Sequence, residues 1–428
     1  MEKIACATTQ KCRVRSLGYY FFMMLRYSFR ILPAAMLLAS CVHQPTPATM
    51  TADTHFEPAR VAAVDHAIDA AIAARTLPGA VYHLERGTAR YQRGYGKLSY
   101  EEDAAAVTQA TVFDVASLSK VLVTAPAVLM LAEEGSIDLE APITRYFAQC
   151  TGGGKDAITV RQLLTHTSGL ASGLPARPAW QGQDAALALA CAQEVTHPPG
   201  SFFRYSDINY ILLGLLVERA SGMPLDRFAQ QRIFAPLGMM RTGYRPLERI
   251  PAASIAPTQR GATEASQLPT AHGDLAPGAP LQGVVHDPTV RRMGGVGGSA
   301  GVFSTVGDVA RFGRMLLGNG TLDGTRILAP DSVRLLTTVQ TPSGIASLRG
   351  MGMDIDSPYA KRPRGALYPV GSYGHTGFTG CILWVDPQSR SFYVFLSNRV
   401  YPDDRSVVLP LYAQLGTLSA QAAVGALQ

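Results

Sequence analysis

The chain has 428 residues, of which 47% are hydrophobic and 16% are charged, and its formal net charge is +6. This composition excludes collagen-like and intrinsically disordered proteins and supplies enough apolar residues for one large domain or two smaller ones. Six of the 38 basic residues but only one of the 32 acidic residues lie within residues 1–40, so the rest of the chain is close to neutral. The net charge therefore gives no reason to expect a nucleic-acid partner.

Residues 1–40 have the pattern of an export leader. The uncharged stretch Ile31–Ser40 follows Arg26 and Arg30 and is too short to span a bilayer as a helix. Its end, the sequence LASC, resembles a bacterial lipobox, in which the cysteine (here Cys41) becomes the lipidated first residue. We therefore expect a lipoprotein that is anchored to the periplasmic face of a membrane. An ordinary signal peptide followed by a chance cysteine is the alternative.

The leader also predicts the boundaries of the mature protein. The segment before Met23 is longer than the basic region of an ordinary signal peptide, so Met23 or Met24 is the expected start of translation. Residues 41–55 are rich in Pro and Thr and predict a tether. Residues 56–428 are expected to form one folded domain.

Three cysteines follow Cys41, namely Cys150, Cys191 and Cys381. So sparse and odd a set is not a disulfide framework, although one pair could be bridged in an oxidising compartment. No Cys and His spacing indicates a structural zinc site.

In chain order, the domain is expected to begin with a helix and a hairpin. Apolar residues recur at helical spacing over Phe56–Arg75, and Pro78 and Gly79 interrupt the pattern. The two short runs that follow, Ala80–Glu85 and Ala89–Gly94, predict a β-hairpin.

A long apolar helix is expected next, over Val115–Glu134. Gly135 is typical of the position after a helix end, and Pro126 is expected to kink the helix or to remove one of its hydrogen bonds. Arg260–Gly283 is rich in Pro, Gly and Ala and predicts a long surface loop. Further helices are expected at Val160–Leu164, Asp184–Gln193, Ile208–Ala220, Leu225–Phe234, Val309–Leu317, Pro330–Thr338 and Val407–Leu415.

Two further strands are expected near the C-terminus. Cys381–Val385 and Phe392–Asn398 alternate in the manner of adjacent antiparallel strands. Strands at both ends of the chain with helices between them predict one α/β fold, of the α+β type, whose sheet joins distant parts of the sequence.

The first chemical motif is Ser117-x-x-Lys120, at the start of the predicted apolar helix. Residues at i and i+3 share a helix face, so the Lys120 ammonium could reach the Ser117 hydroxyl. A serine becomes a good nucleophile only when a neighbouring base takes its proton, and burial can lower the pKa of a lysine. On spacing alone, a helix cap followed by a solvated lysine is the favoured alternative.

Two more motifs follow in a specific order. Arg204–Tyr210 (RYSDINY) enters an apolar helix, and Tyr373–Gly380 (YGHTGFTG) precedes the C-terminal strands. The order Ser-x-x-Lys, Tyr-x-Asn/Asp and Lys/His-Thr-Gly resembles the penicillin-recognising serine hydrolases. The most similar branch contains the class C β-lactamases, the D,D-carboxypeptidases and the related family VIII esterases. The resemblance extends from about Phe56 to Arg399.

The resemblance implies a β-lactamase/transpeptidase-like fold, in which helices flank an antiparallel sheet and an inserted helical region borders the site. It implies that Ser117 is the acylated nucleophile, that Lys120 shares its proton, and that Tyr205 is the base and later the acid for the leaving group. The backbone N–H groups of Ser117 and Phe378 would form the oxyanion hole. In the motif His375-Thr376-Gly377, the first two residues would hold the carboxylate of the substrate.

Two residues depart from the family pattern. Asp207 stands where many relatives have Asn, and an ionised Asp cannot donate an N–H to a substrate carbonyl. If Asp207 faces Lys120, it favours the ammonium form, which makes Tyr205 the working base. His375 replaces a Lys and is neutral near pH 7 unless the site raises its pKa. We therefore expect turnover of carboxylate-bearing substrates to weaken as the pH rises through the pKa of His375.

Other motifs have less specific interpretations. Gly297–Gly301 matches a nucleophile elbow, but no strand precedes it, so Ser299 is expected in a glycine-rich loop. His286 and Asp287 could orient a loop or contact substrate, or could be ordinary loop residues. His166 is expected to shape a loop beside the cleft. Tyr210, Trp180 and Trp384 are expected in the core or in the cleft wall.

The sequence thus predicts a serine hydrolase with no metal and no organic cofactor, which acts on a D-alanyl peptide of peptidoglycan or on a small molecule. A carboxylesterase and a β-lactamase are the alternatives among enzymes. Outside the enzymes, the alternative is a scaffold lipoprotein that binds peptidoglycan or a β-lactam, although such a protein has no need of an activated serine.

Overall fold

The computed structural model describes residues 56–260 and 279–424. The predicted leader, its Cys41 and the tether lie outside the described residues, as does most of the predicted loop Arg260–Gly283.

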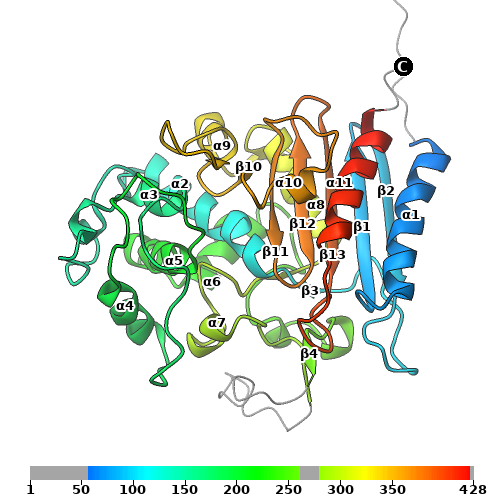
Figure 1. Cartoon of the computed structure of the whole chain (residues 1–428), viewed down its shortest axis with the longest axis horizontal. Coiled ribbons are helices and arrows are strands. Elements are labelled where there is room, and N and C mark those ends of the chain that lie inside the picture. The colour runs from blue at the N-terminus through cyan, green and yellow to red at the C-terminus, as the bar shows by residue number, and fades with distance from the viewer. Residues whose placement is uncertain (1–55, 261–278, 425–428) are drawn as a thin grey trace, which may run out of the picture. The chain divides into compact units, whose positions relative to one another are not determined.

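A seven-stranded antiparallel sheet forms the centre of the fold (Figure 1). Strands from the two ends of the chain lie side by side in it, because β1 pairs with β13 and places Tyr82 opposite Phe395. The prediction of one sheet made from distant strands is therefore confirmed. In spatial order the strands are β2 (Ala89–Gly96), β1 (Gly79–Arg86), β13 (Ser391–Ser397), β12 (Cys381–Asp386), β11 (Tyr373–Gly377), β10 (Asp354–Asp356) and β9 (Leu348–Arg349).

Three short strand pairs lie outside this sheet. One of them, β3 with β6, leads directly into the Ser117 turn and pairs Phe113 with Ser304. The pairs are β3 (Phe113–Asp114) with β6 (Phe303–Ser304), β4 (Gln259–Arg260) with β5 (Pro280–Leu281), and β7 (Thr321–Leu322) with β8 (Thr325–Arg326).

Helices cover both faces of the sheet. Successive side chains of a strand point to opposite faces, so neighbouring residues show what packs against each face. Tyr82 and Ile382 belong to the apolar cluster that contains residues of α1 (Pro58–Ala73) and α11 (Leu409–Val424). Their neighbours Val81 and Leu383 belong to the cluster that contains α8 (Val306–Leu317). Because both faces are covered, every residue of β12 and β13 is buried, and the alternation expected from the sequence does not separate buried from exposed residues.

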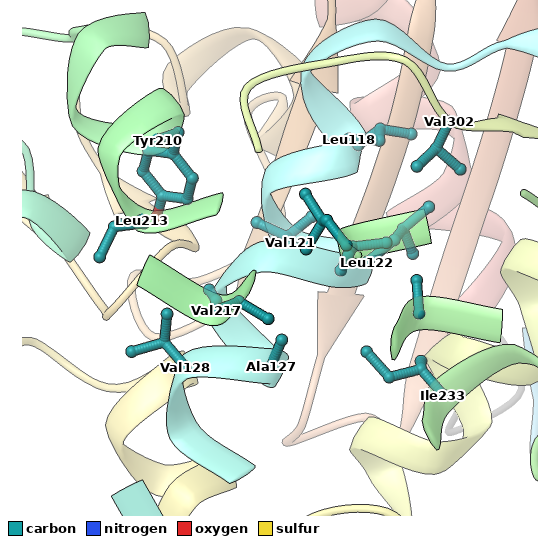
Figure 2. Close-up of a cluster of buried hydrophobic side chains, with 14 of the residues drawn as sticks. Leu118, Val121, Leu122, Ala127, Val128, Tyr210, Leu213, Val217, Ile233 and Val302 are labelled. Carbon is teal, nitrogen blue, oxygen red and sulfur yellow. The ribbon is translucent and has the colours of Figure 1, made fainter. Parts of the chain in front are cut away.

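A helical region lies beside the sheet, with α2 and α5 packed against each other at its centre. Figure 2 shows part of its core, in which Val121 and Leu122 belong to the same buried cluster as Leu213 and Val217 of α5. The remaining helices are α2 (Ala125–Glu133), α3 (Val160–Leu164), α4 (Gln183–Ala192), α5 (Asp207–Ser221), α6 (Leu225–Ala229), α7 (Pro288–Arg292), α9 (Pro330–Thr337) and α10 (Lys361–Arg364).

The helix predicted over Val115–Glu134 is not uniform. It begins with a 3₁₀ turn at Ala116–Leu118, continues as a π turn at Lys120–Thr124, and becomes α2 only at Ala125. The irregular turns precede Pro126, which stands in the first turn of α2, where a proline is tolerated. Gly135 follows the helix with a positive φ of 74°, as expected for its end.

Within the described residues, one helical segment, Ala116–Glu133, is long and apolar enough to cross a membrane. It is 83% buried inside the fold, which is typical of a core helix.

The C-terminal helix is longer than predicted, because α11 continues past Leu415 to Val424. Gly416 lies inside α11 and makes a close packing contact. A Cβ atom at this position would lie 2.3 Å from the carbonyl oxygen of Pro363 in α10. The glycine therefore permits two helices to touch and does not stop one of them.

One disulfide joins Cys150 to Cys191, across 41 residues of the helical region. Cys381 is buried on β12 as a free thiol. Of the three cysteines that follow Cys41, the two that form the bridge are therefore Cys150, before α3, and Cys191, after it.

Candidate active site

Ser117 lies in a strand-to-helix turn with strained backbone. The preceding residue, Ala116, has a φ of 47°, in the left-handed region that costs a residue with a Cβ about 1 kcal/mol or more. Two hydrogen bonds hold the turn: the N–H of Ala116 donates to Oδ1 of Asp114 at 2.8 Å, and the N–H of Val115 donates to the carbonyl of Val302 at 3.0 Å. The sharp turn presents Ser117 to the pocket that it lines.

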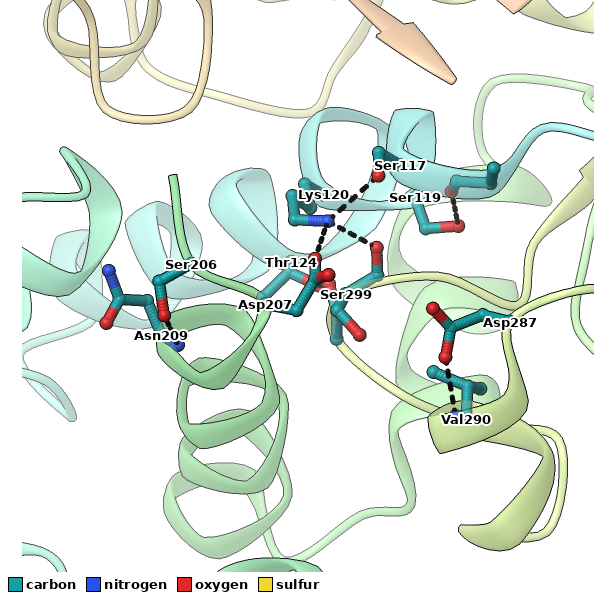
Figure 3. A network of polar contacts seen from close by, with 12 residues as sticks. Ser117, Ser119, Lys120, Thr124, Ser206, Asp207, Asn209, Asp287, Val290 and Ser299 are labelled. Atoms are coloured by element: carbon teal, nitrogen blue, oxygen red, sulfur yellow. Dashed lines mark hydrogen bonds and ion pairs between the residues drawn. The ribbon is translucent and has the colours of Figure 1, made fainter. Parts of the chain in front are cut away.

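Lys120 is fully buried and makes three polar contacts (Figure 3). Its Nζ donates to Oγ of Ser117 at 3.1 Å and to the carbonyl of Ser299 at 2.7 Å. It also forms an ion pair with Oδ1 of Asp207 at 2.7 Å. These three contacts use the three protons of an ammonium group.

The charge of Lys120 follows from these contacts. Burial alone would lower the pKa of Lys120, but the negative charge of Asp207 and the contact with Tyr205 outweigh it and raise the pKa above the ordinary 10.5. Asp207 faces Lys120 and favours the ammonium form, as the sequence predicted for this arrangement, and the lowering of the pKa that burial alone could cause does not occur. A lysine that is an ammonium at neutral pH cannot accept the proton of Ser117.

Tyr205 lies beside this pair, just before α5. Its ring centroid is 5.1 Å from Nζ of Lys120. The rings of His166, Tyr359 and His375 surround it, with centroids at 4.5, 5.3 and 5.9 Å. Tyr205 also lines the same pocket as Ser117, so its phenol is placed within the site.

The first turn of α5 positions Asp207. Ser206 caps the helix by accepting the N–H of Asn209, and the N–H of Asp207 donates to the carbonyl of Ser172 at 2.7 Å. Asp207 thereby becomes the first residue of α5, and its carboxylate reaches across to Lys120.

The pocket at Ser117 has a volume of about 570 Å³. Its wall combines carboxylates with apolar groups, and Phe378 exposes 52% of its surface there. The lining residues are Ala116, Ser117, Tyr205, Asp207, Gln259, His286, Asp287, Pro288, Arg291, Ala300, Phe378 and Asp404.

The His375-Thr376-Gly377 motif is placed differently from the expectation. His375 lies on β11 with only 2% of its surface exposed, and none of the three residues lines the pocket. The Nδ1 of His375 is 2.8 Å from the carbonyl of Thr376. Burial, followed by the charges of Arg349 and Lys120, lowers the pKa of His375 well below 6.5. A buried neutral imidazole cannot attract a carboxylate by charge, so the expected pH dependence through His375 is wrong.

Gly377 serves the site through its lack of a side chain. A Cβ atom there would lie 2.4 Å from the carbonyl of Val115, next to the Ser117 turn. This close approach brings the next residue, Phe378, to the pocket wall. The guanidinium of Arg399 lies 4.3 Å from the ring centroid of Phe378, and its Nε donates to the carbonyl of Phe378 at 2.8 Å.

The glycine-rich loop contributes a group that the sequence did not reveal. Ser299 is buried in this loop, not in a nucleophile elbow, and its carbonyl accepts a hydrogen bond from Lys120. Gly298 packs so tightly that a Cβ atom would lie 2.0 Å from the carbonyl of Tyr210 on α5. The repeated glycines indicated a closely packed loop in the sequence. They did not indicate its partner, because 179 residues separate Ser299 from Lys120.

The His286-Asp287 segment forms one side of the pocket. Asp287 caps α7 by accepting the N–H of Val290 at 2.8 Å. The ring of His286 stacks against Phe378 with centroids 5.8 Å apart, and burial lowers its pKa to about 4. This segment therefore lies where a substrate would touch it.

The residues that were expected in the core or beside the cleft lie there. Tyr210 and Trp384 are fully buried, and Trp180 is partly buried and packs against the core. His166 is buried, with its Nδ1 accepting the N–H of Ser206 at 3.1 Å. The described residues contain no cluster of three or more His, Cys, Asp or Glu side chains that could hold a metal ion.

The fold is that of the β-lactamase/transpeptidase-like serine hydrolases, with an antiparallel sheet and mixed helices. The chain itself belongs to the β-lactamase family, whose model, described as "Beta-lactamase", matches residues 64–417. The chain is therefore a serine hydrolase.

Relatives and solved structures agree with this assignment. A protein of Escherichia coli (strain K12) named "Putative D-alanyl-D-alanine carboxypeptidase" is 30% identical over 331 residues, which cover 70% of this chain and 71% of that protein. A penicillin-binding protein homologue from Caulobacter crescentus has a TM-score of 0.65 at 20% identity, covering 86% of this chain and 98% of its own. A class C β-lactamase has a TM-score of 0.65 at 19% identity, covering 86% and 97%.

Proposed function

We propose that this hydrolase works through an acyl-enzyme on Ser117, with Tyr205 as the base. The observation that carries the proposal is the position of Lys120, whose ammonium touches Ser117 and Asp207 and lies beside the Tyr205 ring. Because Lys120 keeps its proton, it cannot act as the base. Tyr205 lines the pocket together with Ser117 and is the residue to which the family motif assigns that role.

The proposed acylation step runs as follows. Tyr205 takes the proton of the Ser117 hydroxyl, and Oγ attacks the carbonyl carbon of the substrate. The backbone N–H groups of Ser117 and Phe378 stabilise the oxyanion that forms. When the tetrahedral intermediate collapses, the bond to the leaving group breaks, and Tyr205 gives its proton to that group. Lys120 stabilises the negative charge on Tyr205 while the proton is absent.

Deacylation repeats this chemistry with water. Tyr205 takes a proton from the water, whose oxygen attacks the acyl carbon. The ester bond to Ser117 then breaks, and Ser117 recovers its proton. The acid product leaves, and no metal or cofactor takes part in this proposal.

The first proposed substrate is a D-alanyl peptide of the cell envelope. This proposal is supported by the name of the relatives that share 30% identity with the chain. The disulfide Cys150–Cys191 also supports an oxidising compartment, where such peptides occur.

A small carboxylic ester is the second proposed substrate, and one observation favours it. His375 is buried and neutral, so it cannot attract the terminal carboxylate of a peptide by charge. Among the residues that line the pocket, Asp207 is paired with Lys120, Asp287 and Asp404 are further acidic residues, and Arg291 supplies the one guanidinium. An uncharged ester meets no repulsion there.

A direct comparison of substrates tests these proposals. Purified wild-type protein, Ser117→Ala and the control Ser389→Ala, at the turn between β12 and β13, are given a peptide ending in D-Ala-D-Ala, p-nitrophenyl acetate and a penicillin. We expect Ser117→Ala to lose at least about a thousandfold in turnover and Ser389→Ala to retain it. Release of D-alanine supports the peptidase, and ester hydrolysis alone supports the esterase. Unchanged turnover in Ser117→Ala would contradict both.

We also propose that the protein is a lipoprotein at the periplasmic face of a membrane, anchored through Cys41. The LASC sequence and the disulfide support this location. In cells, the mature N-terminal peptide should begin with an acylated Cys41, and Cys41→Ser should release the protein from the membrane fraction. A mature N-terminus at any other residue would contradict the proposal.

A further inference from the structure

Asp114 connects three segments that line the pocket, although it does not line the pocket itself. Its carboxylate is buried, with 1% of the residue exposed. Oδ1 accepts the N–H of Ala116 at 2.8 Å, within the strained turn before Ser117. Oδ2 accepts the N–H of His286 at 2.7 Å, at the start of the opposite wall.

The backbone of Asp114 holds the third segment. Its carbonyl accepts a hydrogen bond from Oγ1 of Thr379 at 2.6 Å. Thr379 directly follows Phe378, whose N–H is the second proposed donor of the oxyanion hole. One residue therefore bonds to the Ser117 turn, to the His286 segment and to the turn between β11 and β12.

We propose that Asp114 is a positioning residue that holds Ser117 and the oxyanion hole in register through its ionised carboxylate. The ionised form offers both oxygens as strong acceptors to the two N–H groups. In the protonated form, the oxygen that carries the proton is a weaker acceptor, and its O–H needs an acceptor of its own. This inference rests on the proposed acyl-enzyme at Ser117.

The surroundings of Asp114 make its charge sensitive to pH. Burial raises the pKa of Asp114 to about 6, against the two N–H donors that lower it. The charged groups that act on it are Asp287, which raises the pKa, and Arg291, which lowers it. The thiol of Cys381 lies 3.6 Å from the carbonyl of Asp114 and stays neutral, because burial raises its pKa to about 12.

The first test is the pH dependence of kcat/KM for p-nitrophenyl acetate between pH 4.5 and 8. We expect the wild-type value to fall as the pH drops through about 6, while circular dichroism shows that the fold persists. Asp114→Asn has the shape of the protonated acid, so its kcat at pH 7.5 should be at least about tenfold lower, with KM changed less than about threefold. Its profile should lack the step near pH 6.

Two variants serve as controls. Asp308→Asn removes another buried carboxylate, which accepts the N–H of Arg241 at 2.8 Å, and this variant should lower the melting temperature but keep the step. Asp287→Asn should also keep the step, shifted to lower pH, because it removes a negative neighbour.

Three results would overturn the inference: a wild-type profile without a step near pH 6, an Asp114→Asn variant with a kcat within about twofold of the wild type, or a step that disappears in Asp287→Asn. Should Asp114→Asn fail to fold, the wild-type and Asp287→Asn profiles decide alone. Activity in Ser117→Ala would instead contradict the proposed function, so the two failures are distinguishable.

Discussion

Asp207 controls the charge of Lys120, and this pairing has a testable consequence. In Asp207→Asn the ion pair is lost, and burial then lowers the pKa of Lys120. If the reaction requires the ammonium form of Lys120, kcat/KM is constant below the pKa of Lys120 and falls as the pH rises through that pKa. We expect the alkaline limb of kcat/KM in Asp207→Asn to lie at least about one pH unit below that of the wild type.

Asp404→Asn is the matched control for this measurement, because Asp404 lines the pocket but makes no ion pair with Lys120. Its alkaline limb should match that of the wild type. The role given to Lys120 fails if Asp207→Asn and Asp404→Asn have the same profile.

His375 leads to a second prediction at this scale. Because its pKa lies well below 6.5, the imidazole is neutral from pH 6 to 8 and does not titrate there. The ratio of kcat/KM for a D-alanyl peptide to kcat/KM for p-nitrophenyl acetate should therefore be constant across this range. The ratio cancels groups that act on both substrates. A ratio that falls about tenfold per pH unit would show instead that His375 binds the carboxylate as a cation.

The sequence predicted part of this chemistry. Motif spacing brought Ser117 and Lys120 together, since i and i+3 share one helical face, and the Asp at position 207 indicated an ammonium partner. The neutrality of His375 could not be predicted, because it depends on burial under other segments and on the charge of Arg349. Asp114 could not be singled out from sequence, because two of its three hydrogen bonds are made to residues far away in the chain.

At the scale of elements, the contact between the glycine-rich loop Gly297–Gly301 and α5 leaves no room for an added side chain. In Gly298→Ala the new Cβ would lie 2.0 Å from the carbonyl of Tyr210, so the loop must move. The movement would weaken the hydrogen bonds that Thr124 and Lys120 make to the carbonyls of Gly298 and Ser299, both at 2.7 Å. We expect the free energy of unfolding to fall by about 3 kcal/mol, measured by urea denaturation.

The control for this substitution is Gly307→Ala in α8. No atom lies within 4 Å of a Cβ at Gly307, and its φ is not in the left-handed region. Alanine there should be neutral or should stabilise the helix by about 0.5 kcal/mol. Equal stabilities of the two variants would show that the loop is not tightly packed.

Elements with strong local patterns were predicted well, and those shaped by contacts were not. The hairpin β1–β2, α3 and the C-terminal strands follow from periodicity and turn residues. The π turn at Lys120–Thr124 has no local signal. The helix predicted to end at Leu415 continues to Val424, and Gly416 within it packs closely against α10, a contact that sequence alone does not show.

At the scale of the whole molecule, the disulfide connects the mature fold to its compartment. Closing a loop of this length is worth about 2–4 kcal/mol, because it restricts the unfolded chain. A reducing agent should therefore lower the stability of the wild type by about this amount and leave the double variant Cys150→Ser/Cys191→Ser unchanged. Free thiols at both positions in protein isolated from intact cells would contradict the proposed oxidising compartment.

The central claim is that Ser117 forms the acyl-enzyme, and the most direct measurement is the mass of the protein after rapid mixing with a penicillin. We expect an increase equal to one penicillin molecule, located by peptide mapping on Ser117 and absent from Ser117→Ala. The lifetime of the adduct then separates a penicillin-binding peptidase, which releases it slowly, from a β-lactamase. An adduct on another residue, or one that also forms in Ser117→Ala, would contradict the account.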